Sequence, residues 1–283
     1  MHMPTTPEET KLIQARYAKV VKANELIQKS RFSLTTQQQK IVLYLISKIT
    51  PEDEAFKRYE FSVMEFCQCA GIDYKSGSSY ASIKKAIKDL RDKSIWVKLP
   101  NGKETTVSWI EKAYIEQRSG LIEIKFDEDM KPWLLQLRGD YTQFELIYTL
   151  HFKSKYAIRL YEIIKSLHYD ELKPYEWVYK VDELCQLLDA EKYSEQWMNF
   201  KARVLAPAID EINKYSDKLV EYEPIKKKNS KKIERIRLYI KTKDTMEVLG
   251  IQKEIEQDLD QGWNNQTSLF DDKVDLLDSA DGK

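Results

Sequence analysis

The side chains that most often carry out catalysis are scarce in this chain and are not spaced for it. Its three histidines, His2, His151 and His168, form no His-x-His pair of the kind that a metal-dependent nicking nuclease needs. The stretch Gly71–Ser79 comes nearest to a phosphate-binding loop, but its spacing is wrong and no lysine follows the second glycine. No nucleophile has a base and an orienting group placed around it. We therefore expect no catalytic residue, no metal site, no cofactor and no enzyme activity.

The three cysteines are also unsuited to metal or disulfide chemistry. Cys67 and Cys69 fall in a predicted helix, where positions i and i+2 point apart, and with Cys185 they are too few for a disulfide framework. This usage is typical of a reducing cytoplasm. No apolar run approaches the roughly 18 residues of a membrane span, and residues 1–10 lack the apolar core of a signal peptide. We expect a cytoplasmic protein with no membrane partner.

Two polar side chains have instead the chemistry that reads DNA bases. Apolar residues at helical spacing predict a helix over residues 196–215, and Asn199 and Arg203 lie opposite its apolar arc. Arginine can bond to guanine O6 and N7 together, and asparagine to adenine N6 and N7. The neighbours Ala202 and Ala206 are small enough to let the helix backbone approach a groove.

Two other residues of this predicted helix depart from the pattern. Lys201 falls on the apolar arc, so we expect its long side chain to extend toward phosphate or solvent rather than to a base. Pro207 has no N–H to donate to the carbonyl of Arg203, which predicts a kink.

The strongest concentration of positive charge follows this helix. From Lys226 to Arg237 there are seven bases and one acid, and the loop joins two predicted strands. A loop of this charge beside a reading helix suits phosphate contacts, which give affinity without sequence information. The alternative is a solubilising turn. The candidate phosphate contacts are Lys226, Lys227, Lys228, Lys231, Lys232 and Arg235.

Lysines also gather on a helix predicted in the first half of the chain, over residues 80–93. Between Lys75 and Lys103 there are eight bases and two acids. In a helix-turn-helix the second helix enters the major groove and exposes its non-core face, and that face is basic here. The alternative is an ordinary solvated lysine face. The candidate contacts of this half are Ser79, Lys84, Lys85 and Lys88.

The net charge of zero, from 46 bases and 46 acids, hides a division along the chain. Residues 244–283 hold 11 acids and 3 bases, which leaves 43 bases and 35 acids in residues 1–243. Such asymmetry is typical of a nucleic-acid-binding body with an acidic tail. A chain that is 42% apolar and 33% charged is a folded protein, and its 8 glycines favour helices over a glycine-rich nucleotide-binding fold.

The elements that must position these residues occur in the same order in both halves. A helix, a short strand, two helices and a hairpin are predicted over residues 35–49, 59–61, 63–70, 80–93 and 95–115, with Asn101-Gly102 as the hairpin turn. The order recurs over residues 152–167, 177–179, 181–188, 196–215 and 219–240. This is the order of a winged helix.

The predicted fold class is therefore α+β, with two tandem winged-helix domains in a pseudo-symmetric arrangement and a flexible acidic C-terminal tail. We place a disordered arm at residues 1–18, an N-terminal winged-helix domain at 19–140, a C-terminal winged-helix DNA-binding domain at 141–243 and the tail at 244–283.

Three motifs resemble those of a known family, the iteron-binding plasmid replication initiators. Residues 20–27 (VVKANELI) with 32–35 (FSLT) are similar to the opening of that family. Residues 154–162 (SKYAIRLYE) resemble its interdomain helix, and residues 200–213 (FKARVLAPAIDEIN) resemble its C-terminal recognition helix. The motifs stand in the family's order, and the resemblance covers roughly residues 20–241.

The resemblance implies two winged-helix domains that bind repeated sites, called iterons, in a plasmid origin. It implies monomers in initiation and homodimers in autorepression, and recruitment of a host initiator and helicase. If both reading helices enter successive major grooves, their contacts lie about 10 bp apart, which predicts direct repeats of about 20 bp. The alternative is a winged-helix transcriptional repressor without initiation activity. An origin-nicking enzyme would need the missing histidine pair.

One short segment of the tail has its own resemblance. Gln266, Leu269 and Phe270 are similar to the peptide that binds the bacterial sliding clamp. In an extended peptide, Leu269 and Phe270 would enter an apolar pocket while Gln266 hydrogen-bonds beside it. The alternative is a chance match. A clamp-binding adaptor without specific DNA binding is a further class that this segment would fit.

Overall fold

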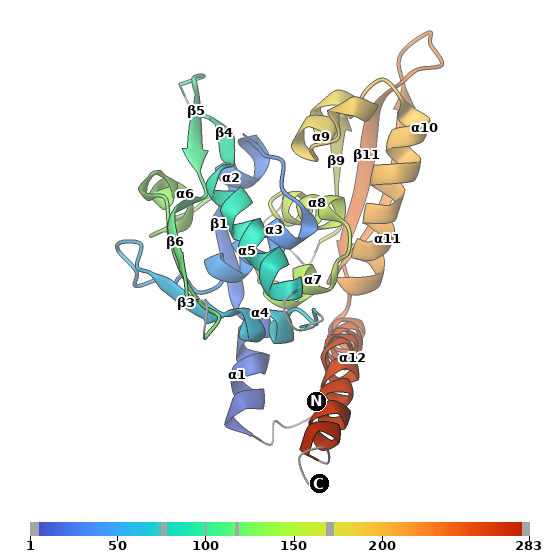
Figure 1. Ribbon diagram of the computed structural model, residues 1–283. Coiled ribbons are helices and arrows are strands. Elements are labelled where there is room, and N and C mark those ends of the chain that lie inside the picture. The colour runs from blue at the N-terminus through green and yellow to red at the C-terminus, as the bar shows by residue number, and fades with distance from the viewer. Residues whose placement is uncertain are drawn as a thin grey trace.

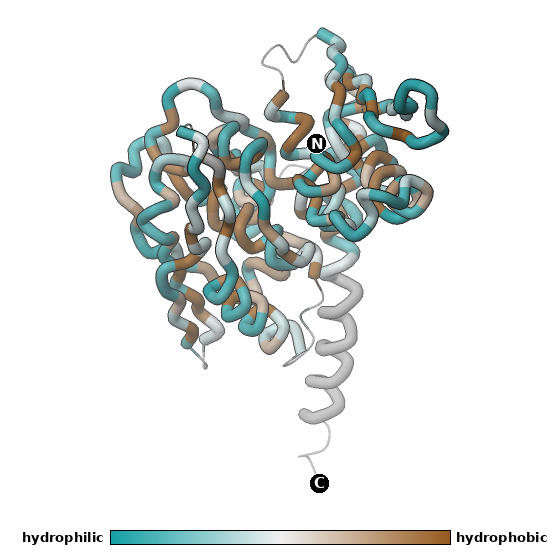
Figure 2. The backbone as a smooth tube through the Cα atoms, turned by 90° about the horizontal axis from the view of Figure 1, so that it is seen from above, coloured by the Kyte–Doolittle hydropathy of each residue, from teal (hydrophilic) through white to brown (hydrophobic). Residues whose placement is uncertain are grey.

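The computed structural model describes residues 6–72, 74, 78–99, 101–116, 119–167 and 173–278, with side chains up to residue 263 apart from that of Lys98. The chain forms two lobes, the first drawn in blue to green and the second in yellow to orange (Figure 1). Seen from above, hydrophilic segments lie along the outer turns of both lobes (Figure 2).

Residues 19–140 contain the elements of the first lobe. In chain order they are β1 (Lys19–Ala23), α2 (Asn24–Lys29), β2 (Ser30–Arg31), α3 (Thr36–Ile46), β3 (Tyr59–Ser62), α4 (Val63–Cys69), α5 (Ser78–Arg91), β4 (Ser94–Lys98), β5 (Glu104–Ser108), β6 (Ile110–Ile115), β7 (Leu121–Phe126), η1 (Glu128–Met130) and α6 (Lys131–Leu134).

Residues 141–243 contain those of the second lobe, and one further helix lies at each end of the chain. The second lobe has β8 (Tyr141–Glu145), α7 (Leu146–His151), α8 (Lys155–Lys165), β9 (Tyr175–Lys180), α9 (Val181–Leu187), η2 (Glu191–Tyr193), α10 (Trp197–Phe200), η3 (Lys201–Leu205), α11 (Ala206–Tyr215), β10 (Lys218–Lys226) and β11 (Ile233–Thr242). The end helices are α1 (Pro7–Arg16) and α12 (Thr245–Asp278).

Both lobes follow the order helix, strand, helix, helix, hairpin, so the predicted α+β fold of two tandem winged-helix domains is confirmed. Capping boxes fix where two of the first-lobe helices begin. Thr35 and Gln38 exchange hydrogen bonds at the start of α3, as predicted, and Ser62 and Glu65 do the same at α4. Helix α3 ends at Ile46, earlier than the predicted residue 49.

The sheets of the two lobes are built differently. In the second lobe β9 joins the hairpin, in the order β10-β11-β9. In the first lobe β4 and β5 pair with β2, whereas β3 pairs with β7. The single strand predicted over residues 104–115 was wrong, because it is divided between two sheets at Trp109. Trp109 is fully buried and its ring contacts Phe32, so the chain turns inward there.

Strand pairing links the two sides of the expected boundary at residue 140. Strand β1 pairs antiparallel with β8, from Lys19 opposite Glu145 to Ala23 opposite Tyr141. The segment that opens the first lobe is therefore held by the segment that opens the second.

A buried ionic network strengthens this link. Nζ of Lys22 donates to Oε1 of Glu162 at 2.6 Å, and Nη1 of Arg159 lies 3.5 Å from Oε2 of the same carboxylate. All three side chains are at most 3% exposed. Arg159 also donates to the carbonyl oxygens of Ile27 at 2.6 Å and Leu187 at 3.1 Å. One guanidinium thus bonds to the backbone of both lobes. Burial lowers the pKa of Lys22, and Glu162 opposes that shift.

The predicted disordered arm is instead helical over Pro7–Arg16. Thr6 and Glu9 form a capping box at its start. At its end Arg16 is 1% exposed and donates to the carbonyl oxygens of Cys69 and Gln68. Both carbonyls lie at the C-terminal end of α4, where helix carbonyls lack i+4 donors, although that of Gln68 also accepts from the N–H of Gly71 at 3.4 Å. The bonds from Arg16 therefore tie the end of α1 to the end of α4.

The region predicted to be a flexible tail is helical from Thr245, and its first part packs on the body. Ile255 and Leu259 are buried, and α12 lies against α4, α7 and α11. Asp260 pairs with Nη1 of Arg16 at 2.7 Å.

Two glycines let α12 approach the end of α4 closely. A Cβ on Gly262 would lie 2.9 Å from the carbonyl oxygen of Gly71. Gly71 itself has a φ of +59°, and a Cβ there would lie 2.9 Å from Cα of Leu259. Neither position has room for a side chain. We call α1 and α12 together the terminal clasp, because both pack on α4 of the first lobe and α7 of the second.

Replacing Glu162 by alanine should lower the free energy of unfolding by about 3–5 kcal/mol, because Lys22 and Arg159 are left as buried cations without their carboxylate. Urea unfolding measures the change. Glu221→Ala, at an exposed strand position, is the control and should change stability by less than about 0.5 kcal/mol. Equal midpoints for the two variants would contradict this account of the network.

Gly262→Ala and Gly250→Ala should have opposite effects. Nothing lies within 4 Å of a Cβ on Gly250, so alanine there should stabilise α12 by about 0.5–1 kcal/mol. At Gly262 the clash with Gly71 should cost about 1–3 kcal/mol. Amide hydrogen exchange of α12 checks both. Equal protection in the two variants would show that the close approach is not needed.

Candidate nucleic-acid interface

The predicted reading helix is formed by α10, η3 and α11, which run on without a break beside β11 (Figure 1). Its middle turn, Lys201–Leu205, is π-helical, and the N–H of Ala206 donates to the carbonyl of Lys201. The irregularity comes just before Pro207, where a kink was predicted. A π-turn absorbs the missing N–H of a proline by shifting the hydrogen-bond pattern by one residue.

The π-turn changes which side chains face outward. Phe200 and Val204 are buried, while Lys201, Ala202 and Arg203 between them are all exposed. Lys201 is exposed, as expected for a long side chain that extends toward phosphate or solvent, although a uniform α-helical period placed this position on the apolar arc. Lys201 stands on the outward face together with Arg203.

Asn199 and Arg203 are exposed on this outward face, as expected for base-reading side chains. Nδ2 of Asn199 donates to Oε1 of Gln196 at 2.5 Å, which orients the amide in the free protein. Met198, next to it, is 71% exposed. An exposed apolar side chain beside two polar ones is the combination that contacts thymine methyl groups and base edges together.

The second wing is the loop between β10 and β11, and every residue of its tip from Lys226 to Lys232 is exposed. Backbone bonds from Lys227 N–H to the Lys232 carbonyl and from Ser230 N–H to the Lys227 carbonyl close the loop. Arg235 is exposed on β11 and lies 3.6 Å from Glu234. The cations predicted to bind phosphate are thus displayed together on one exposed loop and the strand that follows it.

The reading helix and the second wing meet in a groove, which we call the reading groove. Its volume is about 610 Å³, and it is lined by Ser194, Glu195, Gln196, Trp197, Met198, Asn199, Lys231, Lys232 and Ile233. The structure therefore brings together Asn199, Lys231 and Lys232, which are more than thirty residues apart in sequence.

The candidate contacts of the first lobe lie on α5. Lys84, Lys85 and Lys88 are exposed, and Ser79 is half-buried in the first turn of the helix. Lys85 donates to Asp89 at 2.6 Å, so one of the three charges is partly neutralised within the helix. Lys84 and Lys88 remain on the outward face, as predicted.

Three further sets of residues were considered in the sequence: the cysteines, the histidines and the tail segment. All three cysteines are buried free thiols, and burial raises the pKa values of Cys69 and Cys185 to about 12, which makes them poor nucleophiles. Among the described residues no group of histidine, cysteine or acid side chains could hold a metal ion. His2 and His168 lie outside the described residues, as do the side chains of Gln266, Leu269 and Phe270.

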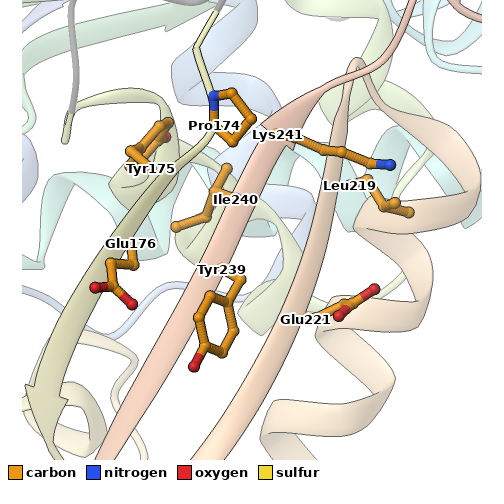
Figure 3. A pocket seen from close by; sticks show the side chains of 8 residues that line it. All are labelled: Pro174, Tyr175, Glu176, Leu219, Glu221, Tyr239, Ile240 and Lys241. Carbon is orange, nitrogen blue, oxygen red and sulfur yellow. The ribbon is translucent and has the colours of Figure 1, made fainter.

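A second hollow, of about 380 Å³, lies on the face of the β10-β11-β9 sheet away from the reading helix. Figure 3 shows Glu176, Tyr239 and Glu221 side by side on its three strands. Glu176 and Glu223 each lie 3.6 Å from Arg237, so two carboxylates share one guanidinium on this sheet. It has none of the concentrated positive charge that a DNA contact needs.

One acid of the reading groove, Glu195, was not predicted from the sequence. Oε2 of Glu195 lies 2.5 Å from Nζ of Lys232, across the groove from the wing. This pairing raises the pKa of Lys232. No local pattern signals it, because the partners are 37 residues apart.

Two family models match the chain in succession. The first, described as initiator replication protein WH1, matches residues 19–165, and the second, initiator Rep protein WH2, matches residues 180–240.

No helix in the described part of the chain combines the length and the apolar character that crossing a bilayer requires.

Two solved structures are similar to this chain. The Pi initiator protein in complex with iteron DNA is 20% identical with a TM-score of 0.67, over 81% of this chain and 99% of that chain. The WH1 domain of a replication protein isolated from a multiple sclerosis patient is 18% identical with a TM-score of 0.25, over 34% of this chain and 76% of that one. The first likeness shows a shared two-domain fold.

The WH1 model alone covers more than half of the chain, and the WH2 model covers the reading helix and the second wing. The three motifs of the sequence fall within these two matches. The chain therefore belongs to the initiator replication protein family.

Proposed function

We propose that this chain initiates the replication of a plasmid by binding iterons, direct repeats of about 20 bp, through both winged-helix domains. The observation that carries the proposal is the reading groove, where Asn199 lies beside Lys231 and Lys232 in the domain that matches WH2. The similar Pi initiator is itself described in complex with iteron DNA. A transcriptional repressor would present the same groove, and a plasmid-maintenance assay separates the two functions.

The proposed binding divides the work between two kinds of side chain. Arg203 and Asn199 read base edges from the reading helix, because both can form paired hydrogen bonds with a purine. The wing lysines and those of α5 bind phosphates, which supplies affinity and fixes the register. Lys201 belongs with the phosphate contacts, since it is exposed beside Arg203.

The proposed partners follow from what the sequence does not contain. Because the sequence has no phosphate-binding loop, the energy for opening DNA must come from elsewhere, and we propose recruitment of a host initiator and helicase. We further propose that the protein has no enzyme activity, acts in the cytoplasm, and exchanges between monomers and homodimers.

Arg203→Ala and Lys227→Ala should weaken DNA binding in different ways. Loss of Arg203 should cost about 1–3 kcal/mol on the preferred site and relax the preference at one base pair. Loss of Lys227 should weaken binding evenly on all sequences and reduce the salt slope by about 1. Titrations with the duplex that the wild type selects from a randomised library, and with random DNA, measure both. Equal losses on both duplexes for Arg203→Ala would remove its reading role.

The tail segment is proposed to bind the bacterial sliding clamp. Leu269→Ala/Phe270→Ala should abolish capture of the purified clamp, since the two apolar side chains would be the anchors, and should leave DNA binding unchanged. Gln261→Ala, in an exposed position just before the segment, is the control. Clamp capture that survives the double substitution would rule the motif out.

A further inference from the structure

Of the three charged residues that line the reading groove, Glu195 is acidic, whereas Lys231 and Lys232 are basic. Glu195 comes two residues before α10 begins, and its side chain is 76% exposed. Its carboxylate bonds to Lys232 at 2.5 Å, and that lysine is 55% exposed. The pair lies beside Asn199 and Lys231 in the same groove.

The position of Glu195 places it toward DNA if the proposed function holds. In a helix-turn-helix the N-terminal residues of the recognition helix contact base edges, and Glu195 lies at that end of the α10–α11 helix. A carboxylate there meets the phosphates of any DNA that approaches. Its negative charge opposes binding unless a donor satisfies it.

The Glu195–Lys232 bond is of the kind that can exchange. Pairs between exposed charges are weak, because water competes for both groups. Lys232 can therefore leave Glu195 for a phosphate when another donor takes its place on the carboxylate. In a complex held by phosphate contacts alone no base edge supplies that donor, so Lys232 stays on Glu195 and the complex has one phosphate contact fewer. In a complex seated in the major groove, the N4 amino group of a cytosine can donate to it.

We propose that Glu195 is a specificity-determining residue, which holds Lys232 in the free protein and penalises complexes with random DNA. Specificity is a difference between two affinities, and a group that weakens the wrong complex raises it as well as one that strengthens the right complex. The inference rests on the proposed function, because it assumes that the reading groove faces DNA.

The test is Glu195→Gln, which removes the charge and keeps the shape. Random DNA should bind about fivefold more tightly, and its salt slope should steepen by about 0.9 because Lys232 is free to contact one more phosphate. The duplex selected by the wild type should not bind more tightly. The preference for the selected duplex should therefore fall about fivefold or more.

Two further variants separate the proposed role from a general charge effect. Glu221→Gln removes one exposed acid from the opposite face of the sheet (Figure 3) and should change binding to both duplexes by less than about twofold. In a Lys232→Gln background, Glu195→Gln should no longer steepen the salt slope, because the lysine it releases is absent.

The outcomes distinguish this inference from the function on which it rests. Equal tightening on both duplexes, or no change on random DNA, would overturn the role of Glu195. A wild type that prefers no sequence over random DNA would overturn the proposed function, whereas the effect of Glu195→Gln on random DNA and its salt slope would still be measured.

Discussion

The arrangement of the two domains depends on one buried network, formed by Lys22, Glu162 and Arg159. A buried carboxylate between two cations is stable only when each partner is present, since an unpaired charge in the interior costs several kcal/mol. The three residues come from two segments 140 residues apart, so the network forms only when both domains are folded and docked. Arg159 adds bonds to the backbone of both domains. The distance between the reading helix and helix α5 follows from this docking.

Order at the two ends of the chain has the same kind of cause. Arg16 satisfies carbonyls at the end of α4 and pairs with Asp260 of α12. The close approach of Gly262 to Gly71 then brings α12 against the first domain. Both helices lie outside the ranges matched by the family models. The contacts that hold the terminal clasp cannot be read from composition. An acidic helix such as α12 can be stable when its few apolar residues are buried against the rest of the protein.

In the second domain, the polar side chains of the reading helix and the lysines of the wing lie close together. At the π-turn before Pro207 three successive residues, Lys201, Ala202 and Arg203, are exposed. The closed wing loop places Lys231 and Lys232 in the groove beside this helix. Glu195 sits among them and neutralises one, so the local charge is lower than the count of basic residues suggests.

The sequence by itself determined the order of elements, the capping boxes, the exposure of Asn199 and Arg203 and the basic wing, because these depend on local periodicity and on side chains a few residues apart. Only the tertiary structure decided the division of the strand at Trp109 and the packing of α1 and α12 as ordered helices. It also decided the buried Lys22–Glu162–Arg159 network and the pairing of Glu195 with Lys232. Each of these rests on partners far apart in the chain. Their energies come from burial and from charges brought together by folding, and neither leaves a signal in a short stretch of sequence.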